Sequence, residues 1–251
     1  MKTAALLLAL GLSATPLWAQ TAAAESASAA ADTAAAPAPL ASPKDPFERG
    51  NRAVYRFNDG LDKAVLKPVA EAYVAAVPEL VRSGVGNFFG NIGDVWSAVN
   101  KLLQGKVVQG AQMTLRVATN TVFGLGGVLD PATEMGLERQ SEDFGQTLGY
   151  WGMPSGPYLV LPLFGPSTLR DAAALPLDKA ATSVSHVIQG DSGVIAANGL
   201  QLTQTRAELL GASKLLGDVS LDPYAFLRDA YLARRRNLVW DGDPPDEDAA
   251  Q

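Results

Sequence analysis

The stretch "GPYLVLPLFGPSTLRD", Gly156 to Asp171, decides how the rest of the chain is interpreted. It is too apolar for an exposed loop, and three prolines interrupt it too often for a buried helix. Its centre, YLVLPLF, is the one strand-like segment of the chain, with glycine or proline on both sides. We therefore expect a Pro/Gly-rich, apolar, hairpin-like segment that something other than water covers, ending in the polar pair Arg170 and Asp171.

Outside this stretch, apolar residues recur at helical rather than strand-like spacing. Asp45-Pro46 and Asp222-Pro223 both have the composition of a helix start, a capping carboxylate followed by proline at the first helical position. We expect helices from Asp45 to Leu61, from Pro68 to Val81, in segments between Gly84 and Gly127, from Ser141 to Tyr150, from Ser167 to Ala181, from Gly193 to Leu216 and from Asp222 to Trp240. The patterns therefore predict an all-α fold with one hairpin, and no spanning helix.

The two ends of the chain differ in composition from its middle. Residues 1–19 have the basic start and short apolar run of an export signal, with cleavage expected between Ala19 and Ala24. Residues 20–44 are rich in Ala, Ser and Pro and are expected to form a disordered tether, and residues 241–251 an acidic disordered tail. The folded domain is then residues 45–240.

Composition excludes several classes of function. The net charge of −6 gives no reason to expect nucleic acid as a partner. The chain has no cysteine and a single histidine, which excludes thiol catalysis, Cys- or His-based metal sites and an acylated N-terminal cysteine. Frequent glycine between residues 84 and 127 weakens helices, so it needs a reason such as close backbone packing or contact with an elongated ligand.

No enzyme motif is assembled. Ser155 lacks the G-x-S-x-G setting of a nucleophile, and His186 is the only available imidazole base. "GLGG", residues 124–127, lacks the strand and lysine of a phosphate loop. Glu142-Asp143 suit a helix start, and the run of arginines at 234–236 suits an exposed helix end. We expect neither an enzyme nor a cofactor or metal site.

Several blocks resemble the MlaA (VacJ) family of outer-membrane phospholipid-transport proteins. They are "DPFERGNRAVYRFNDGLDKAVLKPVAEAYVAAVP", "NFFGNI", "NTVFGLGGVLDPA", "SEDFGQTLGYWGMPSGPYLVLPLFGPSTLRD" and "DPYAFLRDAYLARRR". The block that ends at Asp171 is the most specific of them. The resemblance covers about residues 45 to 236, and it implies a single ring-like domain of mostly amphipathic helices with a polar-lined central channel.

The resemblance also implies a function without bond chemistry. Family members take phospholipid from the outer leaflet of the outer membrane and pass it to a periplasmic carrier, MlaC, and they associate with trimeric porins. They lie in the inner leaflet and so face the periplasm. The chain departs from the family in lacking the acylated cysteine that commonly anchors its members, so anchoring is expected to come from its helices and partners.

The candidate site residues come from the segments that match the family. Phe57 and Tyr158 are expected to shape an apolar wall, Asn58 and Asn87 to offer polar contacts, and Arg170 to meet the head group, with Asp171 paired to it in the absence of lipid. The complete lipid-pathway set is Phe57, Asn58, Asn87, Phe88, Gly156, Pro157, Tyr158, Arg170 and Asp171. Two other functions stay open: a soluble periplasmic structural or adaptor protein, and a periplasmic lipid hydrolase that uses Ser155 or His186.

Overall fold

The computed structural model describes residues 45–219 and 221–245 of the chain. The expected signal peptide, tether and most of the acidic tail lie outside the described residues. The described part is helical apart from one hairpin, which confirms the all-α class. Its helices are α1 (Glu48–Leu61), α2 (Lys67–Ala76), α3 (Glu79–Leu103), α4 (Val107–Val122), α5 (Pro131–Glu134), α6 (Phe144–Tyr150), α7 (Leu169–Ala181), α8 (Asp191–Glu208), α9 (Leu210–Val219) and α10 (Pro223–Val239).

The expected hairpin is present as β1 (Tyr158–Leu161) and β2 (Gly165–Thr168), which pair antiparallel. Val160 lies opposite Pro166, which has no N–H to offer, and Val160 directs its own N–H away from β2 to the side chain of Asn51. Proline is tolerated in a strand at such a position because no ladder hydrogen bond is lost. Leu163 in the turn and Gly165 at the start of β2 both have positive φ.

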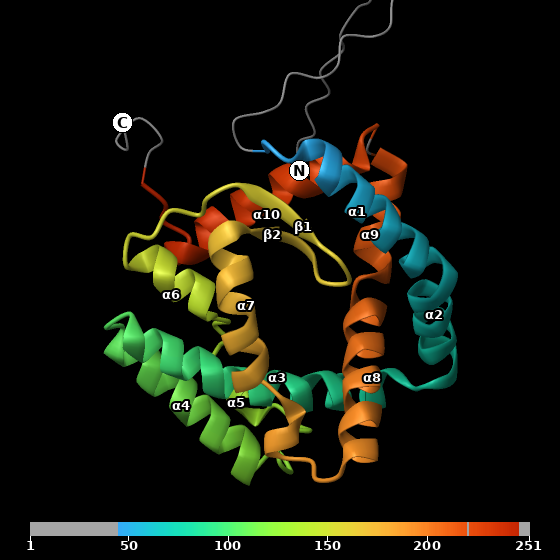
Figure 1. Ribbon diagram of the computed structural model, residues 1–251. Helices are drawn as coiled ribbons and strands as arrows, with labels where there is room; N and C mark the ends of the chain where they lie inside the picture. The colour runs from blue at the N-terminus through green and yellow to red at the C-terminus, as the bar shows by residue number, and fades with distance from the viewer. Residues whose placement is uncertain (1–44, 220, 246–251) are drawn as a thin grey trace, which may run out of the picture. The chain divides into compact units, whose positions relative to one another are not determined.

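The helices and the hairpin form a closed circuit of contacts (Figure 1). Beginning at α1, the circuit passes through α2 to α8, from α8 to α3, from α3 to α6 and from α6 to α10. The hairpin closes it, since β2 contacts α10 and β1 contacts α1. This arrangement of the described residues is the one expected of a ring-like domain of helices.

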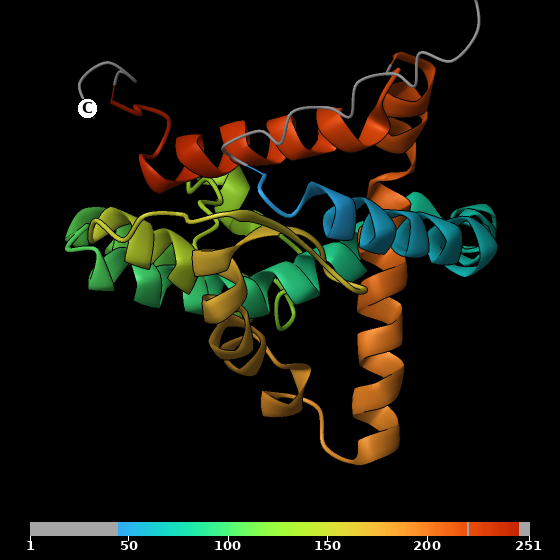
Figure 2. The same cartoon turned by 45° about the horizontal axis from the view of Figure 1, so that its top comes forward.

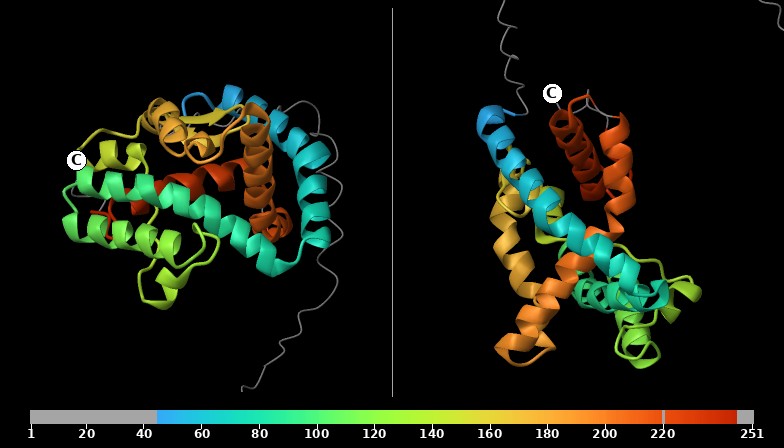
Figure 3. Two further views of the ribbon diagram at one scale, coloured as in Figure 1. Left: turned by 90° about the horizontal axis from the view of Figure 1, so that it is seen from below. Right: turned by 90° about the vertical axis from the view of Figure 1, so that its right-hand side faces the viewer.

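Further helix–helix and helix–hairpin contacts surround this circuit. Helix α4 lies alongside α3 over most of its length, and α2 crosses α8 and contacts it (Figure 3). Figure 2 shows α10 crossing on the far side of the hairpin from α7, and α7 contacts both strands. Two small apolar clusters support these contacts: Phe89, Val184 and Ala197 between α3 and α8, and Tyr158, Val160 and Tyr224 between the hairpin and α10.

The expected boundaries of the first helices are wrong in two places. Helix α1 begins at Glu48 without a side-chain cap, because the carboxylate of Asp45 is buried and accepts hydrogen bonds from Asn51 and Tyr224 instead. Pro68 does not break the helix, because a π-helical turn over Asp62–Leu66 joins α1 to α2 just before it. The break comes at Pro78, where α3 begins.

Further expectations also need correction. Helix α6 is capped by Asp143, whose carboxylate accepts the N–H of Gln146, and not by Ser141. Arg235, expected in an exposed run, has a side chain that is only 12% exposed and forms ion pairs with Asp143 and Asp171. The start expected at Asp222 is confirmed, since Asp222 caps α10, and the cap of the helix expected from Ser167 is Thr168, one residue later. The helix expected from Gly193 to Leu216 is instead two helices, α8 and α9, and the first begins at Asp191.

Candidate functional site: a polar cavity along α3

A cavity of about 660 Å³ lies along one face of α3. The segment before α6, helix α7 and the second half of α8 form its other walls. Its polar lining residues are Glu79, Arg82, Ser83, Asn87, Asp94, Trp96, Ser97, Arg139, Ser141, Glu142, Asp143, Asp178, Thr182, Gln201, Gln204, Thr205 and Glu208. We call it the α3 cavity.

Three glycines line the α3 cavity on one side of the helix. Gly86, Gly90 and Gly93 are three and four residues apart, which places them on one face of α3, here called the glycine face. No atom lies within 4 Å of the position that a side chain would take at Gly93, so its lack of a side chain leaves open space. At Gly90 the same position is 2.6 Å from the guanidinium of Arg139. The glycines therefore make room for the cavity and for Arg139.

The opposite side of α3 is apolar and exposed. Val95 follows Gly86 by nine residues, which is roughly two and a half helical turns and places the two on opposite sides. Val95, Val99 and Leu102 share this outer side and are 51%, 38% and 49% exposed. Helix α3 therefore separates a polar cavity from an apolar surface.

Arg139 brings positive charge to the α3 cavity. Its Nε donates to Asp94 at 3.0 Å, and Asp94 also accepts a hydrogen bond from the buried Arg116 at 3.1 Å. Arg116 also forms an ion pair with Asp130, so two carboxylates share two guanidinium groups, and Asp94 contacts Arg139 only through the Nε of Arg139. The two terminal amino groups of Arg139 make no hydrogen bond to other described residues and lie against Gly90.

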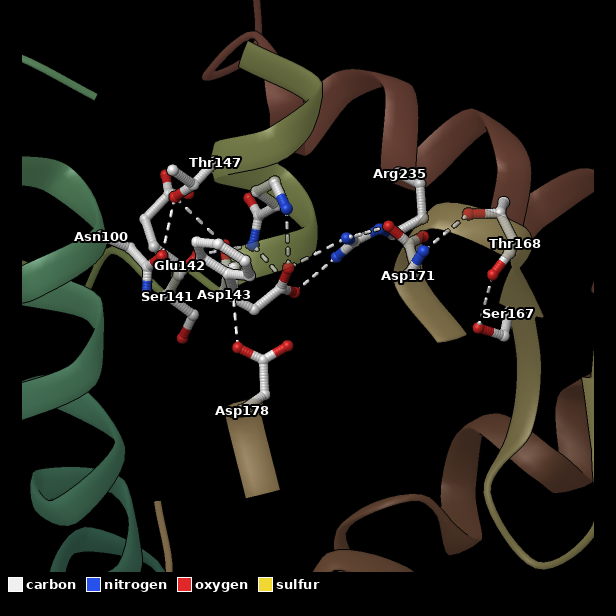
Figure 4. Close-up of polar contacts among 12 residues, drawn as sticks. Asn100, Ser141, Glu142, Asp143, Thr147, Ser167, Thr168, Asp171, Asp178 and Arg235 are labelled. Carbon is white, nitrogen blue, oxygen red and sulfur yellow. Dashed lines mark hydrogen bonds and ion pairs between the residues drawn. The ribbon is translucent and has the colours of Figure 1, made fainter. Parts of the chain in front are cut away.

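Asp178 brings negative charge to the cavity from α7. Its Oδ1 accepts hydrogen bonds from Trp96 Nε1 at 2.7 Å and from the N–H of Phe144 at 2.8 Å. Figure 4 shows its carboxylate pointing toward the start of α6. Within the described residues Asp178 has no basic partner in an ion pair, and its Oδ2 accepts no hydrogen bond. Burial, followed by the charge of Asp143, raises the pKa of Asp178 despite the two hydrogen bonds.

The other carboxylates on this wall, Glu142 and Asp143, form ion pairs with basic side chains outside the cavity lining. Arg235 lies between Asp143 and Asp171 and donates to both (Figure 4), at 2.6 Å to Asp143 and 2.8 Å to Asp171. Burial alone would raise the pKa values of Asp143 and Asp171. The contacts with Arg235 outweigh burial and hold both pKa values below their ordinary range. Glu142 pairs with the buried Lys101 at 2.7 Å, but burial still raises the pKa of Glu142.

Of the predicted pathway residues, only Asn87 lines the α3 cavity. Its Nδ2 donates to the carbonyl of Val128 at 3.2 Å. Phe88, next to it, packs edge-on against Phe89, with ring centroids 5.4 Å apart. Asn87 therefore lies on the cavity wall, whereas the ring of Phe88 belongs to the packing beside the cavity.

Asn58 holds the hairpin and does not line the cavity. Its Nδ2 donates to the carbonyl of Leu161 at 3.0 Å, and its Oδ1 accepts the N–H of Leu163 at 2.9 Å. Asn51, two turns earlier, contacts the hairpin in the same way: it donates to Tyr158 O at 3.0 Å and accepts from Val160 N at 2.9 Å. The two amides form what we call the asparagine clip, which ties α1 to β1.

The remaining predicted residues surround the hairpin. Tyr158 is fully buried, and its ring packs edge-on against the rings of Tyr224 and Tyr231. Phe57 is 58% exposed. Gly156 has φ of +68° and passes close to the side chain of Leu169, whose N–H donates to the carbonyl of Pro157.

The expected pair Arg170 and Asp171 is present but is enclosed. Arg170 Nε donates to Asp171 Oδ1 at 3.1 Å, and its guanidinium also donates to the carbonyl of Met153. Arg170 is 7% exposed and is not part of the cavity lining. Asp171 also accepts hydrogen bonds from Tyr231 at 2.8 Å and from Arg235, so it joins the start of α7 to α10, while Arg170 joins the start of α7 to the segment after α6.

Sequence reasoning missed the charged groups of the cavity. Arg139, Asp178 and Glu208 belong to segments with no recognisable motif, and only the fold brings them together. The glycine face did leave a signal, because glycines three and four residues apart within one helical pattern suggest contact with a ligand or close packing.

Comparison with known proteins identifies relatives over nearly the whole described part. The family model described as "MlaA lipoprotein" matches residues 43–238. The chain belongs to the MlaA family. It is 36% identical over 203 residues to the "Intermembrane phospholipid transport system lipoprotein MlaA" of Escherichia coli (strain K12), which covers 79% of this chain and 80% of that protein. The protein of the same name from Haemophilus influenzae is 32% identical over 202 residues, with 79% and 80% covered.

A solved structure agrees with this family membership. It is described as "Structural basis for maintenance of bacterial outer membrane lipid asymmetry" and matches with a TM-score of 0.65 and 33% identity. The match covers 78% of this chain and 98% of that one. The MlaA relatives are called lipoproteins, whereas this chain contains no cysteine.

None of the helices in the described part of the chain is both long enough and apolar enough to cross a bilayer.

Proposed function

We propose that this protein takes part in intermembrane phospholipid transport and helps to maintain the lipid asymmetry of the outer membrane. The family relationship supports this proposal, since MlaA relatives are named for that transport system. The single observation that carries it is the two-sided character of α3. A passage for phospholipid needs a polar route for the head group next to an apolar surface for the acyl chains.

The apolar side extends from α3 to its neighbour α4. Val108, Leu115 and Val122 are seven residues apart, share one face of α4, and are 69%, 53% and 69% exposed. Exposed apolar faces on neighbouring helices mark a surface for lipid or protein, and amphipathic helices bind in the plane of a membrane interface. We propose that these faces hold the protein in the inner leaflet of the outer membrane without an acylated cysteine.

The direction and the partners belong to the same proposal. Phospholipid that has reached the outer leaflet enters the α3 cavity by its head group and leaves toward a soluble periplasmic carrier of the MlaC type. A trimeric porin is the proposed membrane partner. No covalent chemistry is proposed: Ser155 is exposed, while His186 hydrogen-bonds to the carbonyl of Ala180.

The predicted pathway residues take two roles in this proposal. Asn87 lines the passage. Phe57, Asn58, Phe88, Gly156, Pro157, Tyr158, Arg170 and Asp171 act on the passage through the packing that surrounds it, by fixing the hairpin and the starts of α6 and α7.

The test combines deletion of the gene with a variant that fills the cavity. Deletion is expected to raise surface-exposed phospholipid and detergent sensitivity. Gly93→Leu places a side chain in the open space of the cavity and is expected to give the deletion phenotype at normal protein level. The matched control is Gly199→Leu, a helical glycine outside the lining that also has no atom within 4 Å of its side-chain position.

Three results would contradict the proposal. The first is a deletion strain with wild-type surface phospholipid, and the second is full complementation by Gly93→Leu. The third is recovery of the protein in the soluble periplasmic fraction after a salt wash, which would favour an adaptor protein.

A further inference from the structure

The α3 cavity carries charges of both signs at separate places. Its lining contains six carboxylates and two guanidinium groups, so it has no excess of positive charge toward a phosphate. Of the six, Asp94, Glu142 and Asp143 form ion pairs with basic side chains. The other three, Glu79, Asp178 and Glu208, have no basic partner in an ion pair among the described residues, and Glu208 accepts only a hydrogen bond from Gln204.

Two charged groups of opposite sign, Arg139 and Asp178, flank the glycine face on two sides. Arg139 is held by Asp94, and Asp178 is held by Trp96. Asp94 and Trp96 are two residues apart on α3, which is roughly 200° around the helix axis. Arg139 and Asp178 therefore approach the glycine face from different sides, and they form no ion pair with each other in the described part of the chain.

A head group with one charge of each sign carries a partner for each of these two groups. The terminal amino groups of Arg139 form a planar donor fork suited to phosphate oxygens. The free Oδ2 of Asp178 is an acceptor suited to an ammonium group. A head group with a phosphate but no amine leaves the half-buried Asp178 carboxylate unpaired next to an anion, and an unpaired charge that is partly removed from water is costly.

We propose that the α3 cavity prefers phospholipid with an amine-bearing, zwitterionic head group over phospholipid whose head group is only anionic, with Arg139 contacting the phosphate and Asp178 the ammonium. This inference rests on the proposed function, because it assigns a substrate class to the same passage. The raised pKa of Asp178 is consistent with a carboxylate that lacks a cationic partner until ligand arrives.

The test uses the purified full-length chain in a non-ionic detergent and two short-chain probes, dihexanoylphosphatidylethanolamine and dihexanoylphosphatidylglycerol. Dissociation constants are measured by isothermal titration calorimetry. The wild-type protein is expected to bind the ethanolamine probe about tenfold more tightly, equivalent to about 1.4 kcal/mol.

Asp178→Asn is the decisive variant. An asparagine Oδ1 still accepts the hydrogen bonds from Trp96 and Phe144, so the variant removes the charge and keeps the wall. It is expected to bind both probes with equal affinity. Asp191→Asn at the exposed start of α8 makes the same chemical change outside the lining and is expected to keep the preference. Arg139→Gln is expected to weaken both probes about tenfold, because both contain the phosphate.

Each other outcome overturns a defined part of the proposal. Equal binding of both probes by the wild-type protein, or tighter binding of the glycerol probe, overturns the head-group preference and leaves the transport function standing. A preference that survives in Asp178→Asn removes Asp178 from the site. Binding of neither probe by a protein with native circular dichroism overturns the preference and also counts against the α3 cavity as the passage.

Discussion

Replacement of Arg235 by methionine tests the ionic connection between α10 and the starts of α6 and α7. The guanidinium bridges two carboxylates, with contacts of 2.6 and 3.0 Å to Asp143 and 2.8 Å to Asp171. Methionine keeps most of the volume of the side chain but leaves both carboxylates without this cation. Breaking a buried pair from one side costs about 3–5 kcal/mol.

The expected loss is at the lower end of that range. The Asp143 side chain is 34% exposed, so water screens part of its charge, whereas the Asp171 side chain is 9% exposed and keeps its contacts with Arg170 and Tyr231. We expect Arg235→Met to lower the free energy of unfolding by about 3 kcal/mol at pH 7. The assay is urea unfolding of the full chain, followed by circular dichroism. Arg234→Met, one residue earlier and exposed, is the matched control and is expected to change stability by less than about 0.5 kcal/mol.

The pH dependence of this loss gives a second check. The folded-state pKa values of Asp143 and Asp171 are lowered, so the stability from the pairs is fully present above the ordinary pKa near 4 and is lost as the pH falls through the lowered values. The difference between wild type and Arg235→Met should therefore be largest at pH 7 and should shrink as the pH falls below about 4. A loss of less than about 1 kcal/mol at pH 7, or an undiminished loss under acidic conditions, would refute this reasoning.

The same unfolding assay tests three other predictions. Asn51→Leu should lower the free energy of unfolding by about 2–3 kcal/mol, because buried backbone groups of β1 lose their partners. Asn58→Leu, at the more exposed turn, should lower it by about 1 kcal/mol, and equal losses would contradict the burial argument. Asp178→Asn should be at least as stable as wild type at pH 7, because the raised pKa of Asp178 means that folding disfavours its charged form. This advantage should disappear as the pH falls below about 4, and a variant that is less stable than wild type at pH 7 would contradict the prediction. Lys101→Met should cost about 3 kcal/mol because Glu142 is then buried without its cation, and a loss below about 1 kcal/mol would argue that the pair is not enclosed.

Local patterns were enough to predict most of the secondary structure. The helical spacing of apolar residues, the cap expected at Asp222 and the strand-like segment YLVLPLF all correspond to observed elements. The errors fall where a tertiary contact competes with a local one. Asp45 has the sequence context of a cap, but its carboxylate is used in a buried contact with Asn51.

The candidate site was harder to predict because its groups come from separate segments. The family resemblance and the charges of Arg170 and Asp171 predict a contact with the head group, but the fold buries Arg170 and pairs Asp171 with α10. Asp178 belongs to no recognisable motif, and its place on the cavity wall depends on Trp96 and the start of α6. Contacts between residues that are far apart in the chain leave no periodic pattern in a single sequence.

The asparagine clip has a consequence for how the hairpin behaves toward other molecules. A two-stranded sheet leaves unpaired N–H and C=O groups along its outer edges, and such edges add strands from other chains. Asn51 and Asn58 take up outward backbone groups along β1 and its turn with side chains from a helix. A clip variant that still folds would thus present a short apolar template for edge-to-edge aggregation, a liability that two amides remove without a third strand.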